Sequence, residues 1–548
     1  MGPKTTRSLS SSKFITAALR YQWLNHVNEY PALPPILNTE TTSTSVLNAV
    51  VSRICKADSF PKKTVGRLAP AQYRVSRFDG KIRFMEMPHP VPYFFLIQNL
   101  DKHWRELLPL ISSESSRIRP KNYPRDQRIV LFGHDYGSEE LLPFTLDNNF
   151  PELEYSLSRG IVVQLDISNF FPSIYTHAID WAVSGGRSHN RGPGSEIDKS
   201  FQRVRTNRTD GISIGPVTSN VAAEVILSDL DKELSKLEYP VLYSRAIDDL
   251  TILIPSNEDP DELSNLVSKE LSKVGLALNH AKTKITPLKS FYSQHISKSL
   301  TQVTDLISGY PSKKKLRQAF SSLYVLADEK PANSLVKYGW KLIRSIVDSQ
   351  VQEGEIYILR YFIILSWEMA THYPHMVPSV VAETIFRQPM LNGDVPEQFV
   401  LDFLMQELPK GITDISAWLL FYCYDRGIDP TPALVSIDFF NSSNLADLRS
   451  TSIDAFIGCV LLAFQDCEIN ERLVEIFTDP DYFSDDRTEK WSDYWPVRYM
   501  LYKHKAISEK QLNDKECKAF DFLNAEGFSL IRESNTDYKL LLDKFREC

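Results

Sequence analysis

The segment Val241-Leu242-Tyr243-Ser244-Arg245-Ala246-Ile247-Asp248-Asp249-Leu250-Thr251-Ile252-Leu253-Ile254 decides which fold this chain is expected to adopt. Two apolar, β-forming runs flank Asp248-Asp249, which predicts two strands joined by a tight turn with both carboxylates at its tip. A separate apolar run, residues 161–165, ends at Asp166. Carboxylates that are close in space but distant in sequence are what two-metal phosphoryl transfer requires. These three aspartates therefore form the candidate site.

The two neighbouring aspartates are not expected to be equivalent, because successive residues near a strand end point to opposite sides. We assign the direct metal contact to Asp248 and a supporting position to Asp249, with Asp166 as the second anchor. The expected metal is Mg²⁺, which prefers oxygen ligands and combines few carboxylates with substrate phosphates; Mn²⁺ can substitute. An Asp-Asp pair by itself most often marks a solvated turn, so the surrounding segments decide the interpretation.

Three further segments occur in a fixed order around the aspartates. Residues 167–175 (ISNFFPSIY) indicate a strand-to-helix transition, with Pro172 entering the first helical turn. Residues 211–220 (GISIGPVTSN) place small residues before a helical apolar pattern, which lets backbone approach a ligand closely. Residues 275–283 (GLALNHAKT) place Lys282 after a short apolar segment.

In this order and spacing, the four segments resemble motifs A, B, C and D of the reverse transcriptase palm. The resemblance covers residues 60–300 and is strongest over 161–284. Its details are similar to bacterial defence-associated and abortive-infection reverse transcriptases, through Gly215-Pro216, Ala223-Glu224 and the SIYTH stretch at 173–177. The resemblance implies an α+β right-hand polymerase fold with fingers, a palm with an antiparallel sheet, and a thumb. It also implies an all-α C-terminal domain resembling helical repeats.

The resemblance implies roles for individual residues. Asp166 and Asp248 would bind the metals with Asp249 beside them, and the carbonyl of Ile167 would be an additional ligand. Lys282 would protonate the leaving pyrophosphate.

Substrate contacts follow from the same resemblance. Phe171 matches the bulky position that rejects a 2′-hydroxyl, which favours deoxynucleotides and argues against an RNA polymerase; the alternative is a core aromatic. The complete set of expected substrate contacts is Ile167, Phe171, Gly215, Pro216 and Arg245.

Two positions depart from the family pattern. Motif C usually has tyrosine where this chain has Ala246, and Ile214 replaces the motif B glutamine. The missing aromatic side chain normally packs near the primer terminus. We therefore expect intact metal binding but altered positioning of primer or template.

Composition agrees with a large intracellular enzyme, and a chain of 548 residues is expected to form more than one domain. Its six cysteines include no Cys-x-x-Cys pair, so neither a zinc ribbon nor a disulfide framework is indicated, and a reducing, cytoplasmic environment is expected. The apolar stretch 357–367 is interrupted by Arg360 and is shorter than the roughly 20 residues that span a bilayer. No membrane association is expected.

Charge is unevenly distributed along the chain. Residues 1–130 contain 20 Lys and Arg against 9 Asp and Glu, a net of +11, whereas residues 301–548 have a net of −11. A basic N-terminal third suits the binding of template backbone and triphosphate. The candidates are Lys81, Arg83, Arg117, Arg119, Lys121, Arg125 and Arg128. A second group of arginines lies in the stretch 184–210, whose Gly and Pro content predicts loops.

The C-terminal half is expected to be an irregular array of helices that bury one another's apolar faces. Helical patterns occur at 334–347, 355–370, 396–408 and 453–464. The expected divisions are a basic N-terminal region with fingers at 1–135, palm at 136–290, thumb-like segment at 291–340 and helical domain at 341–548.

These features predict an RNA-directed DNA polymerase of bacterial anti-phage defence that uses deoxynucleoside triphosphates; template-independent and protein-primed synthesis remain open. By resemblance, the expected partners are RNA or DNA, a dedicated noncoding RNA, a second copy of the chain and a second defence protein. The alternative is a catalytically silent nucleic-acid-binding or effector scaffold. The retained Asp166, Asp248, Asp249 and Lys282 favour the enzyme, and Ala246 is the main support for the scaffold.

Overall fold

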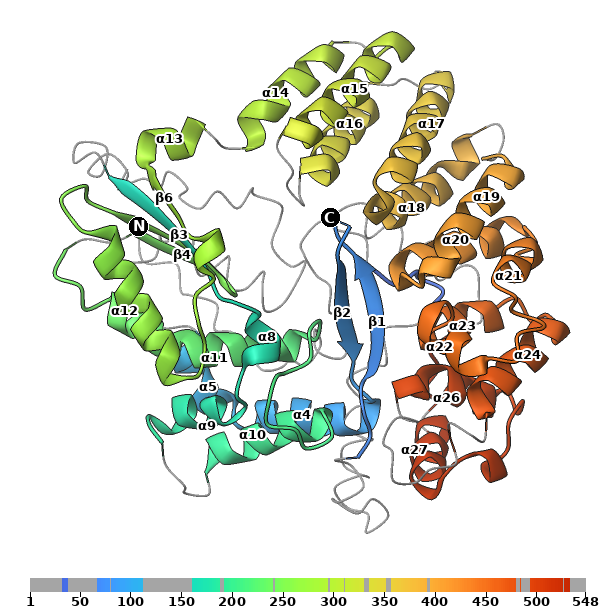
Figure 1. The fold of residues 1–548 in the computed structure, drawn as a ribbon, viewed down its shortest axis with the longest axis horizontal. Helices are drawn as coiled ribbons and strands as arrows, with labels where there is room; N and C mark the ends of the chain where they lie inside the picture. The colour runs from blue at the N-terminus through green and yellow to red at the C-terminus, as the bar shows by residue number, and fades with distance from the viewer. Residues whose placement is uncertain are drawn as a thin grey trace, which may run out of the picture.

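The computed structural model describes residues 32–37, 67–78, 80–111, 160–187, 192–239, 242–293, 296–309, 311–329, 335–350, 356–391, 395–479, 483, 493–525 and 527–532. Within these ranges the fold is mostly helical, with a four-stranded sheet and a two-stranded sheet (Figure 1). In the part described, no helix is both long enough and apolar enough to cross a bilayer.

The four-stranded antiparallel sheet carries the candidate aspartates. Its strand order is β4 (Leu242–Ala246), β5 (Asp249–Ile254), β3 (Ile161–Asp166) and β6 (Lys284–Pro287). Side chains on both faces of β3 are buried, since Val163 joins the main core and Val162 packs with Leu253 and Leu288 on the opposite face. Burial on both faces fixes the register, because a slip by one residue would exchange the two faces.

Helices cover one side of this sheet. The central one, α11 (Val217–Leu234), is buried nearly all round and packs against three neighbours. These neighbours are α5 (Trp104–Ile111), α9 (His177–Ser184) and α12 (Pro260–Lys273).

The expectation of loops across residues 184–210 is wrong for its middle part. Helix α10 (Pro193–Val204) forms there and packs against α9 and α4 (Pro90–Lys102). Pro193 occupies the first helical turn, where its missing N–H costs nothing and its fixed φ favours the helix.

The two-stranded sheet is a hairpin of β1 (Ala71–Ser76) and β2 (Ile82–Met87). It lies between the helices beneath the larger sheet and the C-terminal helices (Figure 1). Strand β1 contacts α20 (Thr413–Arg426) and α23 (Ala455–Leu462).

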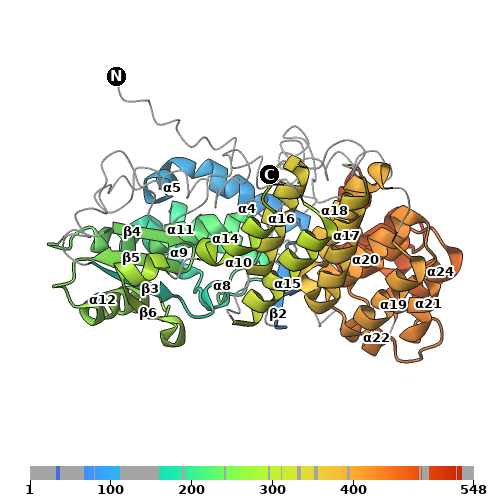
Figure 2. The same cartoon turned by 90° about the horizontal axis from the view of Figure 1, so that it is seen from above.

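The C-terminal half is a succession of packed helices, as the helical patterns predicted. Helices appear at all four predicted places: α16 (Leu335–Gln350), α17 (Ile356–His372), α19 (Glu397–Glu407) and α23. Between and around them lie α14 (Ile296–Ile307), α15 (Lys313–Glu329), α18 (Val377–Arg387), α21 (Thr431–Ser436), α22 (Leu445–Thr451), α24 (Cys467–Thr478), α26 (Trp495–Lys503) and α27 (Asp514–Ala525). Figure 2 shows the four-stranded sheet at one end of the molecule and α21 and α24 at the other.

Candidate active site

The β3–β5 ladder brings the predicted aspartates together. Asp166 and Asp249 are direct partners in this antiparallel pair, so their side chains leave the sheet on the same face. Asp248 lies in the adjoining turn, and its carbonyl accepts a hydrogen bond from the N–H of Ile167 at 3.1 Å. The predicted hairpin is confirmed, although the turn is Ile247-Asp248 and Asp249 already begins β5. The direct metal contact assigned to Asp248 stays a prediction.

Burial and neighbouring negative charge both raise the pKa values of Asp249 and Asp248. Although part of the Asp249 side chain is open to solvent, desolvation and then the charges of Asp248 and Asp166 raise its pKa to about 6. Desolvation also raises the pKa of Asp248, and the charge of Asp166 acts in the same direction. A nearby cation relieves such repulsion. The donors are all oxygens, which is the ligand chemistry that Mg²⁺ and Mn²⁺ prefer, so the residues fit the expected metal.

Two side chains of the motif D segment hold Asp166. Lys282 Nζ lies 2.8 Å from Asp166 Oδ2, and Asn279 Nδ2 donates to Oδ1 at 3.0 Å. The segment reaches this position because it runs beside the end of β3, where Ser168 N–H donates to the Ala277 carbonyl at 2.8 Å. Asn279 was not predicted as a site residue. The feature of the sequence that could have indicated it is its position three residues before Lys282. The Lys282 side chain is 60% exposed, and exposed ion pairs contribute only about 0–1 kcal/mol, so a metal can compete for Asp166.

Arg245 occupies a different place from the one expected. Its guanidinium is fully buried beneath the hairpin, with Nη1 and Nη2 each 2.8 Å from a Glu224 carboxylate oxygen. It also pairs with Asp231 at 3.0 Å, and Tyr243 donates to Asp231. The expected substrate contact is therefore corrected: Arg245 joins β4 to α11 and does not face the site.

The same guanidinium supports the turn that presents Asp248. Arg245 Nη1 lies 3.4 Å from the carbonyl of Ile247, whose φ is +59°. A β-branched residue rarely adopts this left-handed conformation and needs support from its surroundings. The ion pairs from α11 therefore help to hold the turn in shape.

The remaining predicted contacts lie on the loops around β3 and α11. Phe171 is half-buried against the core, and Gly215 has a φ of +121° that favours glycine. Pro216 is buried at the start of α11, and the Ile167 side chain is buried as well. Any contact of Pro216 or Ile167 with a substrate or metal would therefore have to come from backbone atoms.

One of the predicted basic residues lies in the electrostatic range of the site. Arg83 is on β2; desolvation and then the charge of Arg77 lower its pKa, and the charges of Asp248 and Asp249 act in the opposite direction. A cation of the hairpin thus interacts electrostatically with aspartates of the other sheet. Lys81 is exposed just before the same strand. Arg117, Arg119, Lys121, Arg125 and Arg128 lie outside the described residues.

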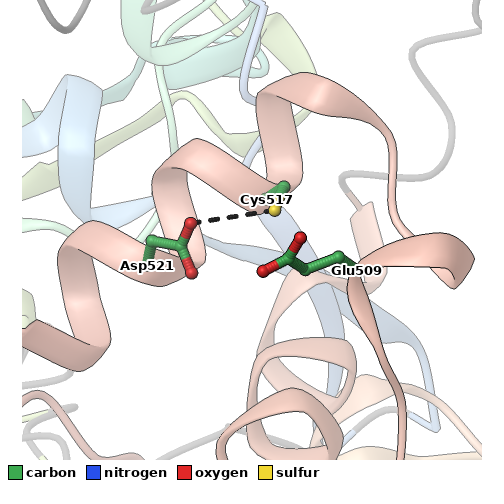
Figure 3. Close-up of side chains that lie close together, drawn as sticks. All are labelled: Glu509, Cys517 and Asp521. Atoms are coloured by element: carbon green, nitrogen blue, oxygen red, sulfur yellow. Dashed lines mark hydrogen bonds between the residues drawn. The ribbon is translucent and has the colours of Figure 1, made fainter.

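A second group of potential metal ligands occurs far along the chain, where Glu509, Cys517 and Asp521 have ligand atoms within 4.8 Å of one another (Figure 3). Asp521 already accepts a hydrogen bond from Tyr502 at 2.6 Å and from the Cys517 thiol at 3.7 Å. Desolvation and then the charge of Asp521 raise the pKa of Cys517 to about 11, so its metal-binding thiolate is disfavoured. This group does not resemble a metal site.

No protein-family model and no curated protein matches the sequence. The solved structures to which the chain is similar include telomerases. One is telomerase from Candida albicans with a fragment of telomeric RNA, at 12% identity and a TM-score of 0.26, covering 70% of this chain and 68% of that one. Another is apo telomerase from Candida tropicalis, at 13% identity and a TM-score of 0.30, covering 74% and 73%.

Proposed function

We propose that this chain is a DNA nucleotidyltransferase of the reverse transcriptase type. The observation that supports it best is the pairing of Asp166 with Asp249 across β3 and β5, with Asp248 in the adjoining turn. Sequence-distant carboxylates at one edge of an antiparallel sheet match the requirement of two-metal phosphoryl transfer. A solvated Asp-Asp turn would not need Asp166 opposite it.

Each residue of the site has a place in this reaction. Asp166, Asp248 and Asp249, with the Ile167 carbonyl, would hold Mg²⁺ or Mn²⁺, which lowers the pKa of the primer hydroxyl and stabilises the leaving pyrophosphate. Arg83 balances the negative charge of the incoming triphosphate. Lys282, once separated from Asp166, has a proton to give to the pyrophosphate.

The substrate and biological context are part of the proposal and rest on sequence resemblance. Phe171 at the sugar position selects deoxynucleotides, and the template is RNA. The context is bacterial anti-phage defence in the cytoplasm, with a second copy of the chain, a noncoding RNA or a second defence protein as partners. Because Ala246 replaces the usual motif C tyrosine, we expect primer and template to be positioned differently from the usual pattern. Synthesis without a template, or from a protein primer, is therefore part of the same proposal.

The experiment supplies the purified protein with each deoxynucleoside triphosphate separately and with all four together, in Mg²⁺ or Mn²⁺, and sequences any product. Asp248→Asn should abolish product. Asp261→Asn is the matched control, because Asp261 is exposed in the first turn of α12, away from the site, and loses the same charge.

Absence of product from the folded protein under every condition, with cellular RNA added, would contradict the proposal. If the protein then still retained RNA, the nucleic-acid-binding scaffold would be favoured, with Ala246 as its supporting observation. Equal product from Asp248→Asn and the unaltered protein would remove the aspartates from the mechanism.

A further inference from the structure

The outer edge of β1 is covered by the C-terminal helices. The N–H of Arg74 donates to Thr413 Oγ1 at 2.8 Å, and the N–H of Ser76 donates to the Asp414 carboxylate oxygens at 3.1 and 3.2 Å. Ser76 Oγ also donates to Asp414 Oδ2 at 2.7 Å. Thr413 and Asp414 are the first two residues of α20, and both are buried. An edge strand normally leaves such N–H groups unpaired, so α20 acts in place of a further strand.

A second contact ties the same strand to the end of α22. The Arg74 guanidinium donates to the carbonyls of Ser450 and Thr451, the latter at 3.4 Å. Gly411 permits this approach, because a Cβ there would lie 1.7 Å from the Thr451 carbonyl oxygen and 2.7 Å from Arg74 Nη1. Its φ of +58° also favours glycine.

Aromatic contacts extend the β1–α20 interface along the hairpin. Tyr73 is buried and meets Phe456 of α23 edge-on, with ring centroids 5.1 Å apart. Beyond the strand, Phe78 stacks on Tyr373 at 5.7 Å. Buried hydrogen bonds and ring contacts together make this interface a specific one.

The other strand of the hairpin is tied to the candidate active site. Glu86 N–H on β2 donates to the Ile214 carbonyl of the motif B loop at 3.1 Å, and the Glu86 carboxylate pairs with Arg205 at 3.2 Å. Arg83, three residues earlier on β2, interacts electrostatically with Asp248 and Asp249. The hairpin is therefore held by the C-terminal helices on one edge and by the palm on the other.

We propose that Asp414, acting through Ser76, is a positioning residue that sets the β1–β2 hairpin and thereby the motif B loop, which β2 contacts through the hydrogen bond from Glu86 N–H to the Ile214 carbonyl. The C-terminal helices are then a working part of the nucleotide site, in addition to any scaffolding role. The nucleotide-binding part of this inference rests on the proposed function; the positioning of the hairpin does not.

The test compares the full-length protein with Asp414→Asn and Ser76→Ala. Asp402→Asn is the control, because Asp402 is exposed on neighbouring α19 and loses the same charge without touching β1. Hydrogen exchange of residues 71–87 should be about tenfold faster in Asp414→Asn, since charge-assisted hydrogen bonds are lost, and roughly threefold faster in Ser76→Ala. The dissociation constant for dGTP with Mg²⁺ should rise about fivefold in Asp414→Asn, with KM affected more than kcat. Asp402→Asn should match the unaltered protein in both.

Each result decides one step. Unchanged exchange across 71–87 in both variants overturns the positioning of the hairpin, and Ser76→Ala keeps this test available if Asp414→Asn does not fold. Faster exchange with unchanged dGTP affinity overturns the link from the hairpin to the nucleotide. If the unaltered protein binds no dGTP, the proposed function fails, while the exchange result still tests the hairpin.

Discussion

At the scale of single residues, Lys282 forms an ion pair with Asp166, a carboxylate that the expected metal needs as a ligand. Replacing Lys282 by methionine removes this competitor and leaves the carboxylates more negative. We expect Mn²⁺ to bind about threefold more tightly, in line with the modest strength of an exposed pair. The measurement is a Mn²⁺ titration in which electron paramagnetic resonance detects the free and bound ion.

Lys284→Met is the control for this change. Lys284 is exposed on β6 and lies two residues after Lys282 in the sequence. Equal affinities in the Lys282 variant and the unaltered protein would show that the ion pair does not compete with the metal. Weaker binding would place Lys282 among the groups that support the metal.

Phe171 offers a second test at this scale. Phe171 follows β3 after Asn169, whose φ is +45°, and its ring is half-buried. Phe171→Ala should raise the ratio of ribonucleotide to deoxynucleotide incorporation by about tenfold or more, because the excluded 2′-hydroxyl gains space. Single-nucleotide incorporation assays measure this ratio. Unchanged sugar selectivity would remove the assigned role, and Tyr175→Ala at a nearby exposed position is the control.

At the scale of secondary-structure elements, the buried charges between β4 and α11 are expected to have a large effect on the free energy of unfolding. Glu224, Asp231 and Arg245 are each no more than 3% exposed. Removing one partner of such a network leaves the others charged and buried, which costs about 3–5 kcal/mol. Arg245→Gln should therefore lower the free energy of unfolding by about this amount, measured by denaturant titration.

Arg245→Lys separates charge from geometry in this network. Lysine keeps the charge but cannot make the paired contacts to Glu224 or reach the Ile247 carbonyl in the same way. We expect a smaller loss of stability together with weaker Mn²⁺ binding, because the turn that presents Asp248 loses its support. Wild-type stability and metal affinity in this variant would contradict the role given to the guanidinium.

Sequence patterns predicted this part of the molecule unevenly, for physical reasons. Strand alternation and turn chemistry correctly predicted the hairpin with Asp248, but alternation does not tell which face of β4 Arg245 occupies. The order of the four segments correctly predicted that Asp166 lies near Asp248 and Asp249, whereas Asn279 is marked only by its place three residues before Lys282. Helix α10 was missed because Gly192-Pro193 is typical of loops and also of a helix start.

At the scale of the whole molecule, contacts between distant segments could not be predicted from local patterns. Ser76 and Asp414 are 338 residues apart, and neither lies in a motif that indicates a partner. The helical patterns of the C-terminal half were predicted correctly, yet they specify apolar faces and not which element those faces cover. The long-range contacts make the N-terminal hairpin and the C-terminal helices one structural unit.

His89 belongs to this unit and predicts how stability depends on pH. Its buried ring caps α4 by accepting the Val91 N–H at 3.3 Å, and it lies 5.0 Å from the ring of Trp495 on α26. Desolvation lowers its pKa to about 3 in the folded state, against about 6.5 unfolded. Between these values the unfolded chain binds the extra proton, so the free energy of unfolding falls as the pH drops from 6.5 towards 3.

The expected loss from His89 is several kcal/mol, at about 1.4 kcal/mol for each pH unit below 6.5. Denaturant titrations of the unaltered protein and His89→Gln, between pH 7.5 and 4.5, measure it by difference, because other titrating groups contribute equally to both. His89→Gln should be less stable at pH 7.5, where the packed ring is lost, but its stability should fall less steeply on acidification. Parallel curves would show that His89 is not neutral and desolvated in the folded protein, and hence that the contact between α4 and α26 is looser than the structure shows.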